Sequence, residues 1–158
     1  MNRKELLGQI NLSSYVAFDF ETTGLSSTKD RIIEIAAIRF VDGEISDRYV
    51  TLVNPDQNIS TMITKITGIT NQMVADKPHE KEILNDLISF IGEDPLVAHN
   101  INFDKNFLDS LFRRYQKELN KSAMYDTLQL ARCLAFGEAV FNLGSISEYF
   151  GLSSSGSH

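Results

Sequence analysis

An apolar run followed by two acids is the feature of this sequence that most constrains its fold. Residues 15–18 are typical of a short buried strand, and residues 22–24 are typical of the turn that closes it. Asp19 and Glu21 stand between them, one residue apart. Because residues i and i+2 of a strand project from the same face, the sequence predicts two carboxylates side by side at the end of a buried strand.

Such a pair of carboxylates is typical of a cation-binding site. Two neighbouring carboxylates raise each other's pKa unless a cation or a shared proton lies between them. Mg²⁺ and Mn²⁺ prefer oxygen ligands, and Mg²⁺ is commonly held by one or two carboxylates together with substrate phosphate. The alternative is that one acid caps a turn and the other is solvated. We favour the metal site, because Gly24 follows the acids and permits close approach of the backbone to a ligand.

The composition is that of one globular domain. The chain has 158 residues, 42% of them hydrophobic, which is enough to bury a core. Its single cysteine, Cys133, excludes an internal disulfide and is expected to be a buried apolar residue of a helix. No run approaches transmembrane length, so we expect a cytoplasmic protein without a membrane partner. The net charge of −6 argues against a broad electrostatic contact with duplex nucleic acid.

The rest of the sequence alternates between strand-like and helix-like patterns. A β-branched run at 31–41, a turn signal at Asp42-Gly43 and an alternating run at 44–53 predict a β-hairpin. Two more short strands are expected at 95–99 and 124–127. Helices are expected at 3–10, 59–66, 79–91, 102–119, 128–136 and 142–150, with one more short helix capped by Thr70 or Asn71.

A second acidic feature follows the strand predicted at 95–99. Asn102 is placed to cap the next helix, which puts Asp104 in the first turn, where the helix dipole favours a carboxylate. That place is also where a parallel α/β sheet exposes ligand groups at its strand ends. We expect His99 to be a structural histidine, with a metal ligand or a base as the alternative. Glu34 is expected to make structural hydrogen bonds, with a place near the metal site as its alternative.

In these segments the sequence resembles the DEDD exonucleases of the histidine type, the branch that includes the proofreading subunit of bacterial DNA polymerase III. Residues 18–25 match the first motif of the family, and residues 99–104 match the second. Supporting matches lie at 32–36, 66–70 and 125–128. The resemblance spans residues 15–158, nearly the whole chain.

The resemblance implies an α/β, ribonuclease H-like fold, which is a mixed five-stranded sheet flanked by helices with its first three strands antiparallel. It divides the chain into an N-terminal helical extension at 1–14 and an exonuclease domain at 15–158 that is expected to be truncated at its C-terminus. It also implies 3′–5′ hydrolysis of single-stranded DNA or RNA ends to nucleoside 5′-monophosphates, in proofreading or repair.

The resemblance assigns roles to the matched acids. Asp19, Glu21 and Asp104 would hold two Mg²⁺ or Mn²⁺ ions, with Asp19 bridging, and such ions activate the attacking water and stabilise the leaving oxygen. His158 falls at the position of the family's general base, and an ordinary pKa of about 6.5 suits that role. The alternative is that residues 156–158 are only a tail. The family's fourth metal-binding acid would lie beyond His158.

The predicted substrate contacts lie around the terminal nucleotide. Phe103 is placed either to pack beside a base or to be buried in its helix. The other predicted contacts belong to the first motif and are Thr22, Thr23, Gly24 and Leu25. Asp126, the alternative candidate for the fourth acid, is expected to cap a helix instead.

Functions from three classes are compatible with these residues. The leading hypothesis is a metal-dependent 3′–5′ exonuclease, because Asp19, Glu21 and Asp104 are all present. The second is a weakly active or inactive nuclease-like module that binds strand ends, or a polymerase or helicase partner. A phosphatase of the aspartyl-phosphate type is disfavoured, because no lysine stands in the motifs.

Overall fold

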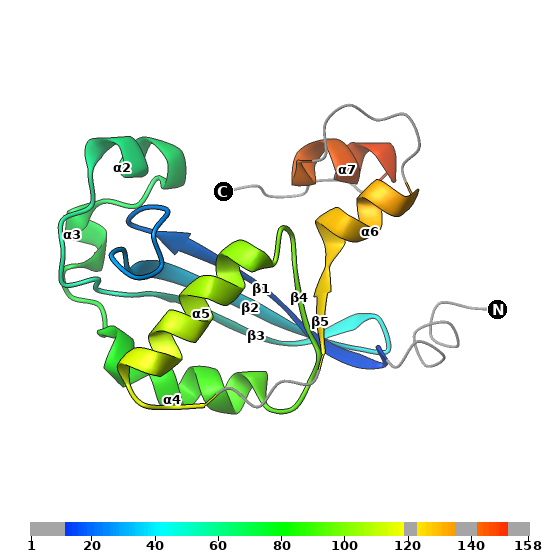
Figure 1. The fold of residues 1–158 in the computed structure, drawn as a ribbon, viewed down its shortest axis with the longest axis horizontal. Helices are drawn as coiled ribbons and strands as arrows, with labels where there is room; N and C mark the ends of the chain where they lie inside the picture. The colour runs from blue at the N-terminus through cyan, green and yellow to red at the C-terminus, as the bar shows by residue number, and fades with distance from the viewer. Residues whose placement is uncertain (1–11, 119–122, 135–141, 152–158) are drawn as a thin grey trace.

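A mixed sheet of five strands in the order β3-β2-β1-β4-β5 forms the centre of the structure (Figure 1). The computed structural model describes residues 12–118, 123–134 and 142–151. The strands are β1 (Ser14–Thr22), β2 (Ile32–Val41), β3 (Glu44–Leu52), β4 (Leu96–Ala98) and β5 (Met124–Asp126). The pairs β1–β2 and β2–β3 are antiparallel, and β1–β4 and β4–β5 are parallel. The predicted sheet is therefore confirmed.

The predicted hairpin is β2–β3. Asp42 and Gly43 both have positive φ, 51° and 85°, as a tight hairpin turn requires. The strand β1 is longer than predicted: it runs through Asp19 and Glu21 to Thr22, because β2 provides backbone partners as far as that residue. The two acids thus lie inside the strand and share its alternation of faces.

Six helices are described. They are α2 (Thr61–Thr67), α3 (Asn71–Val74), α4 (Glu80–Ile91), α5 (Asn102–Arg114), α6 (Thr127–Leu134) and α7 (Leu143–Tyr149). Side chains of Ser60, Thr70 and Asn142 accept hydrogen bonds from backbone amides in the first turns of α2, α3 and α7. Within the described ranges, no helix combines the length and the apolar composition needed to cross a membrane. The helix predicted at 3–10 lies outside the described residues.

Three details of the helices differ from the prediction. Asn102 is the first residue of α5 and does not cap it; Ile101 precedes the helix without a side-chain cap. The helix α5 ends at Arg114 rather than at 119, because the chain turns with a positive φ of 53° at Gln116. Cys133 is exposed rather than buried. It lies two residues, about 200°, from the buried Ala131 and therefore on nearly the opposite side of α6.

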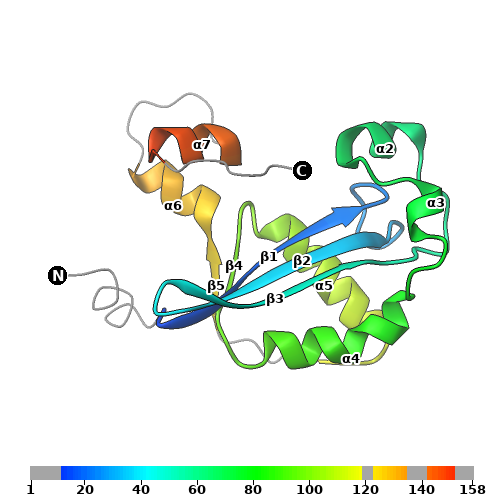
Figure 2. The ribbon, with the colours of Figure 1, turned by 180° about the vertical axis from the view of Figure 1, so that it is seen from behind.

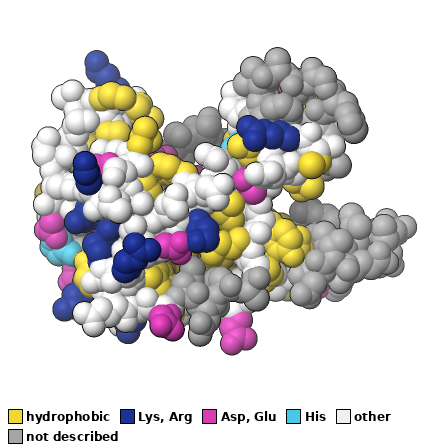
Figure 3. Space-filling view, in the orientation of Figure 1, with side chains coloured by type: hydrophobic (Ala, Val, Ile, Leu, Met, Phe, Trp, Pro, Cys, Tyr) yellow, Lys and Arg dark blue, Asp and Glu magenta, His cyan; other side chains and the backbone are white. Residues whose placement is uncertain are grey.

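The main core lies between one face of the sheet and the helices α4 and α5, which cover it together (Figure 1). From β1, Val16, Phe18 and Phe20 point into this core. Seen from behind, the opposite face of β1–β3 is not covered by α4 or α5 (Figure 2). Figure 3 shows the molecule in the orientation of Figure 1. On the face seen there, basic and acidic side chains of the described residues are interspersed, and no extended patch of them carries charge of one sign.

The fold makes a first prediction. Leu108 of α5 is fully buried, whereas Leu130 of α6 is 58% exposed. Replacement of Leu108 by Ala should lower the free energy of unfolding by about 2–5 kcal/mol, because it leaves a cavity in the core. The same change at Leu130 should alter it by less than about 0.5 kcal/mol. Urea denaturation measures both variants, and equal losses would contradict this assignment of the core.

Candidate active site

The strand β1 presents Asp19 and Glu21 on the face opposite to the main core. Phe18 and Phe20 are buried, while Asp19 is exposed and Glu21 is partly buried, as the alternation of a strand requires. The register with β2 places Glu34 directly opposite Glu21. The prediction that Asp19 and Glu21 share one face is thus met. Glu34 lies beside these acids, which was the alternative place for it, and its expected hydrogen-bonding role stays a prediction.

Asp104 reaches the same strand from the first turn of α5. Its side chain is 2% exposed, and its Oδ1 accepts a hydrogen bond from the backbone amide of Phe20 at 3.0 Å. The strand β4 pairs with β1 only at Val16 and Ala17, so this amide lies beyond the part of β1 that β4 pairs with. The carboxylate of Asp104 takes the place of a missing strand partner and is held between Asp19 and Glu21 along β1.

The three carboxyl groups interact electrostatically. Burial raises the pKa of Asp104 to about 7, and the neighbouring charges of Asp19 and Glu21 add to this effect against the hydrogen bond from Phe20. Although Asp19 is exposed at its surface, desolvation by the surrounding protein also raises its pKa, and His99 counteracts this effect. The pKa of Glu21 is raised by burial first, and then by Asp19 and Glu34. These groups therefore form one electrostatically coupled cluster, which we call the acid cluster: Asp19, Glu21, Glu34 and Asp104.

The acid cluster has the donor chemistry of a divalent-cation site. In the parts of the chain that are described, no three His, Cys, Asp or Glu side chains converge closely enough to hold a metal ion as they stand. The available donors are carboxylate oxygens, the ligands that hard divalent cations prefer. A cation would also relieve the mutual repulsion that raises the pKa values of these groups. The residues therefore fit such an ion by chemistry and charge.

The predicted substrate residues of the first motif divide into an inner and an outer set. The hydroxyl of Thr22 donates to the carbonyl of Gly24 at 2.7 Å, and that of Thr23 accepts from the amide of Arg31 at 3.0 Å. Both threonines are nearly buried, at 6% and 9% exposure, so their hydroxyls serve the loop itself. By contrast, Leu25 is 87% exposed and stands free on the loop surface.

Gly24 is required by the space inside this loop. A Cβ atom at position 24 would lie 2.5 Å from Oδ2 of Asp30, too close for any other residue without a shift. The carboxylate of Asp30 in turn accepts a hydrogen bond from the amide of Ser26 at 2.8 Å. Asp30 therefore lies in close contact with Gly24, and the approach of a ligand to Gly24 stays a prediction.

Of the other predicted residues, Phe103 is partly buried and its ring lies 5.1 Å from that of Phe107. The Nδ1 atom of His99 lies 3.1 Å from the hydroxyl of Thr127, as expected for a structural histidine. Asp126 accepts from the amide of Leu128 at 2.9 Å and caps α6, as predicted. His158 lies outside the described residues, so its role as a general base stays a prediction.

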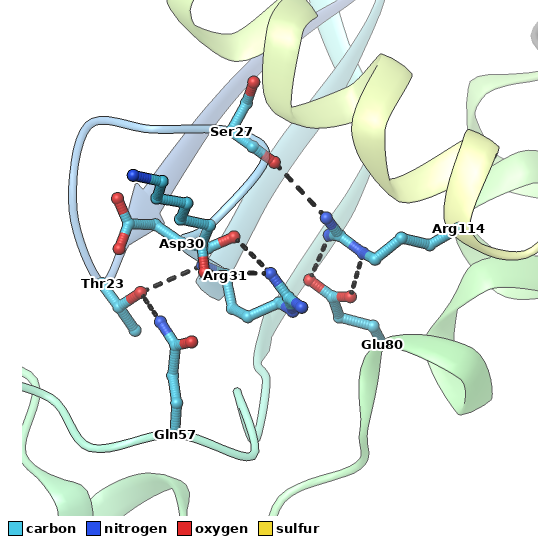
Figure 4. Close-up of polar contacts among 8 residues, drawn as sticks. Thr23, Ser27, Asp30, Arg31, Gln57, Glu80 and Arg114 are labelled. Carbon is cyan, nitrogen blue, oxygen red and sulfur yellow. Dashed lines mark hydrogen bonds and ion pairs between the residues drawn. The ribbon is translucent and has the colours of Figure 1, made fainter.

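Two sets of contacts that hold the loop were not predicted. Gln57 donates a hydrogen bond from its side chain to the hydroxyl of Thr23, and Arg114 of α5 donates to the carbonyl of Ser27 at 3.4 Å (Figure 4). Arg114 is also paired with Glu80. No local pattern indicates these partners, since Glu80 and Arg114 lie 34 residues apart on different helices.

Comparison with solved structures reveals the same fold in known exonucleases. Exonuclease X, solved in complex with 5′ overhanging duplex DNA, is 28% identical, with a TM-score of 0.69 over 89% of this chain and 75% of that one. A product-bound exonuclease I is 22% identical, with a TM-score of 0.78 over 89% of this chain and 39% of that one. At that lower identity, the second likeness shows the fold alone.

Sequence comparison gives longer relatives. DNA polymerases III of the PolC type from Oceanobacillus iheyensis and Bacillus subtilis are 45% and 43% identical over 77% of this chain, and that from Clostridium perfringens is 41% identical over 91%. The chain spans only 8–10% of the length of these polymerases. The sequence model of the RNase_T exonuclease family matches residues 16–158. The chain therefore belongs to this exonuclease family.

Proposed function

We propose that this chain is a metal-dependent 3′–5′ exonuclease domain that removes nucleotides from single-stranded DNA ends as nucleoside 5′-monophosphates. The observation that carries the proposal is the hydrogen bond from the Phe20 amide that holds Asp104 against the strand carrying Asp19 and Glu21. The PolC-type polymerases among its relatives support a proofreading role beside a polymerase. The DNA in the exonuclease X complex supports DNA as the substrate.

In this proposal Asp19, Glu21 and Asp104 would hold two divalent cations, either Mg²⁺ or Mn²⁺. When bound, the cation supplies positive charge that stabilises the phosphate oxygens of the transition state. The bond from the Phe20 amide to one oxygen of Asp104 holds this carboxyl group beside β1. Glu34 adds a fourth negative charge opposite Glu21 and strengthens the attraction for cations.

The loop that follows β1 would meet the terminal nucleotide. Its inner threonines are committed to hydrogen bonds within the protein, so Leu25 is the side chain that we assign to contact with a base. An apolar contact of this kind with a base does not depend on which base it is, as removal of any terminal nucleotide requires. His158 is proposed to take the proton from the attacking water.

A second prediction tests the chemistry. Asp19→Asn removes one charge from the acid cluster with little change of shape, and should lower the rate of nucleotide release on the order of 100-fold or more. Asp47→Asn, in an exposed part of β3, is the matched control and should release nucleotides at the rate of the unaltered chain. The measurement is mononucleotide release from a 3′-labelled single strand with Mn²⁺, repeated with EDTA and with a 5′ label.

The outcomes separate the candidate functions. Release of the 3′ label first, dependent on Mn²⁺ and lost in Asp19→Asn, supports the proposal. A folded chain that binds the strand but does not cut it under any metal condition would instead support the nuclease-like binding module.

A third prediction concerns pH and metal together. The pKa of Asp104 is raised from 3.8 to about 7 in the folded state, so the folded chain binds an extra proton between these values. The stability that this group contributes is present below about pH 4 and is lost as the pH rises to about 7, by at most about 4 kcal/mol. Asp104→Asn keeps an acceptor for the Phe20 amide but carries no charge.

Without divalent ions, Asp104→Asn should therefore gain stability relative to the unaltered chain as the pH rises from 4.5 to 8. At pH 8, Mn²⁺ should stabilise the unaltered chain and have a smaller effect on the variant, because a ligand that binds only the folded state stabilises it. Urea denaturation at both pH values measures this. A difference between the two chains that is independent of pH would refute the placement of Asp104.

A further inference from the structure

The loop between β1 and β2, residues 23–31, is closed on itself by hydrogen bonds. The amide of Thr23 donates to the carbonyl of Arg31 at 2.9 Å, and the amide of Asp30 donates to the carbonyl of Ser26 at 2.7 Å. The carboxylate of Asp30 fills the interior beside Gly24. These bonds give the loop a definite shape, but they do not fix where the loop stands relative to the helices.

A partly buried ion pair stands beside this loop. Glu80, in the first turn of α4, is only 4% exposed, and Arg114, in the last turn of α5, donates to both of its oxygens. The two hydrogen bonds measure 3.0 Å from Nε and 2.8 Å from Nη2. Such a bidentate pair fixes the plane of the guanidinium group, and each charge also suits the dipole of its own helix end.

The third nitrogen of the same guanidinium reaches the loop. Its Nη1 donates to the carbonyl of Ser27 at 3.4 Å, so one side chain joins α4, α5 and the loop (Figure 4). On the other flank of the loop, Gln57 donates to Thr23. The loop is thus held from both sides, and on the helix side Arg114 is the side chain that holds it.

We propose that the Glu80–Arg114 pair positions the loop between β1 and β2 for the substrate. Glu80 fixes the guanidinium of Arg114, which holds Ser27 and so sets where Leu25 meets the end of the nucleic-acid strand. This inference rests on the proposed function. Arg114 lies ten residues, or about 15 Å along the helix, from Asp104, so it acts on substrate binding and not on the acid cluster. Arg114 is a positioning residue and does not contact the reacting atoms.

Arg114→Lys is the test variant. A lysine still neutralises Glu80, but its single ammonium group cannot make the bidentate pair and reach Ser27 in the same geometry. We expect KM for a single strand to rise about 5- to 20-fold while kcat changes less than about 2-fold, the pattern of lost binding without lost transition-state stabilisation. Arg113→Lys, the exposed neighbour on α5, is the matched control and should leave both constants unchanged.

A double variant distinguishes a lost position of the loop from a loss of folding. Glu80→Gln with Arg114→Met removes both charges, so no unpaired charge is left buried. It should show the same rise in KM. Amide hydrogen exchange at residues 26–30 should be faster in Arg114→Lys and in the double variant, but not in Arg113→Lys, while exchange in the core of β2 stays slow.

These outcomes distinguish the inference from the proposed function. Unchanged KM and unchanged loop exchange in folded Arg114→Lys would overturn the positioning role and leave the exonuclease proposal intact. If the unaltered chain cuts no strand, the proposed function fails, and the affinity for a single strand then replaces KM as the readout. Equal affinity of the unaltered chain and Arg114→Lys would in that case overturn the inference as well.

Discussion

The hydrogen bond from the amide of Phe20 to Asp104 is the interaction on which the fold and the site both depend. The strand β4 is three residues long, so β1 continues past it and leaves a buried amide without a strand partner. An unpaired buried donor costs about 1–3 kcal/mol. Asp104 satisfies this donor from the first turn of α5, and the same bond brings its carboxylate to the strand that carries Asp19 and Glu21.

The position of Asp104 suits cation binding but lowers the stability of the folded state when this group is ionised. A carboxylate that is 2% exposed and surrounded by like charges is unfavourable in its ionised form, which is the form that would bind a cation. The apolar contacts of α4 and α5 with the sheet offset that cost, since Phe107, Leu108 and Leu111 are fully buried close to Asp104 in the same helix. The core thus holds in place a group whose ionised form disfavours the folded state.

Features set by local sequence were predictable, and those set by distant partners were not. The turn at Asp42-Gly43 and the caps at Thr70 and Asp126 follow from the residues themselves. The extent of β1 depends on its register with β2, and the Glu80–Arg114 pair depends on how two helices meet. Asp19 and Glu21 were predicted to lie together from the alternation of a strand, and Asp104 was added by its match to a family motif. The hydrogen bond from Phe20 that brings Asp104 to β1 required the three-dimensional structure.

The helix α5 carries Asp104 at one end and Arg114 at the other. Ten residues at about 100° each set the two side chains at fixed relative directions around the helix axis. One inserted or deleted residue between them would turn one end by a quarter of a turn or more and move it along the axis, which no side-chain rotation restores. The number of residues between Asp104 and Arg114 is therefore fixed by the two ends that α5 has to place, whereas a substitution on its exposed side leaves that spacing unchanged.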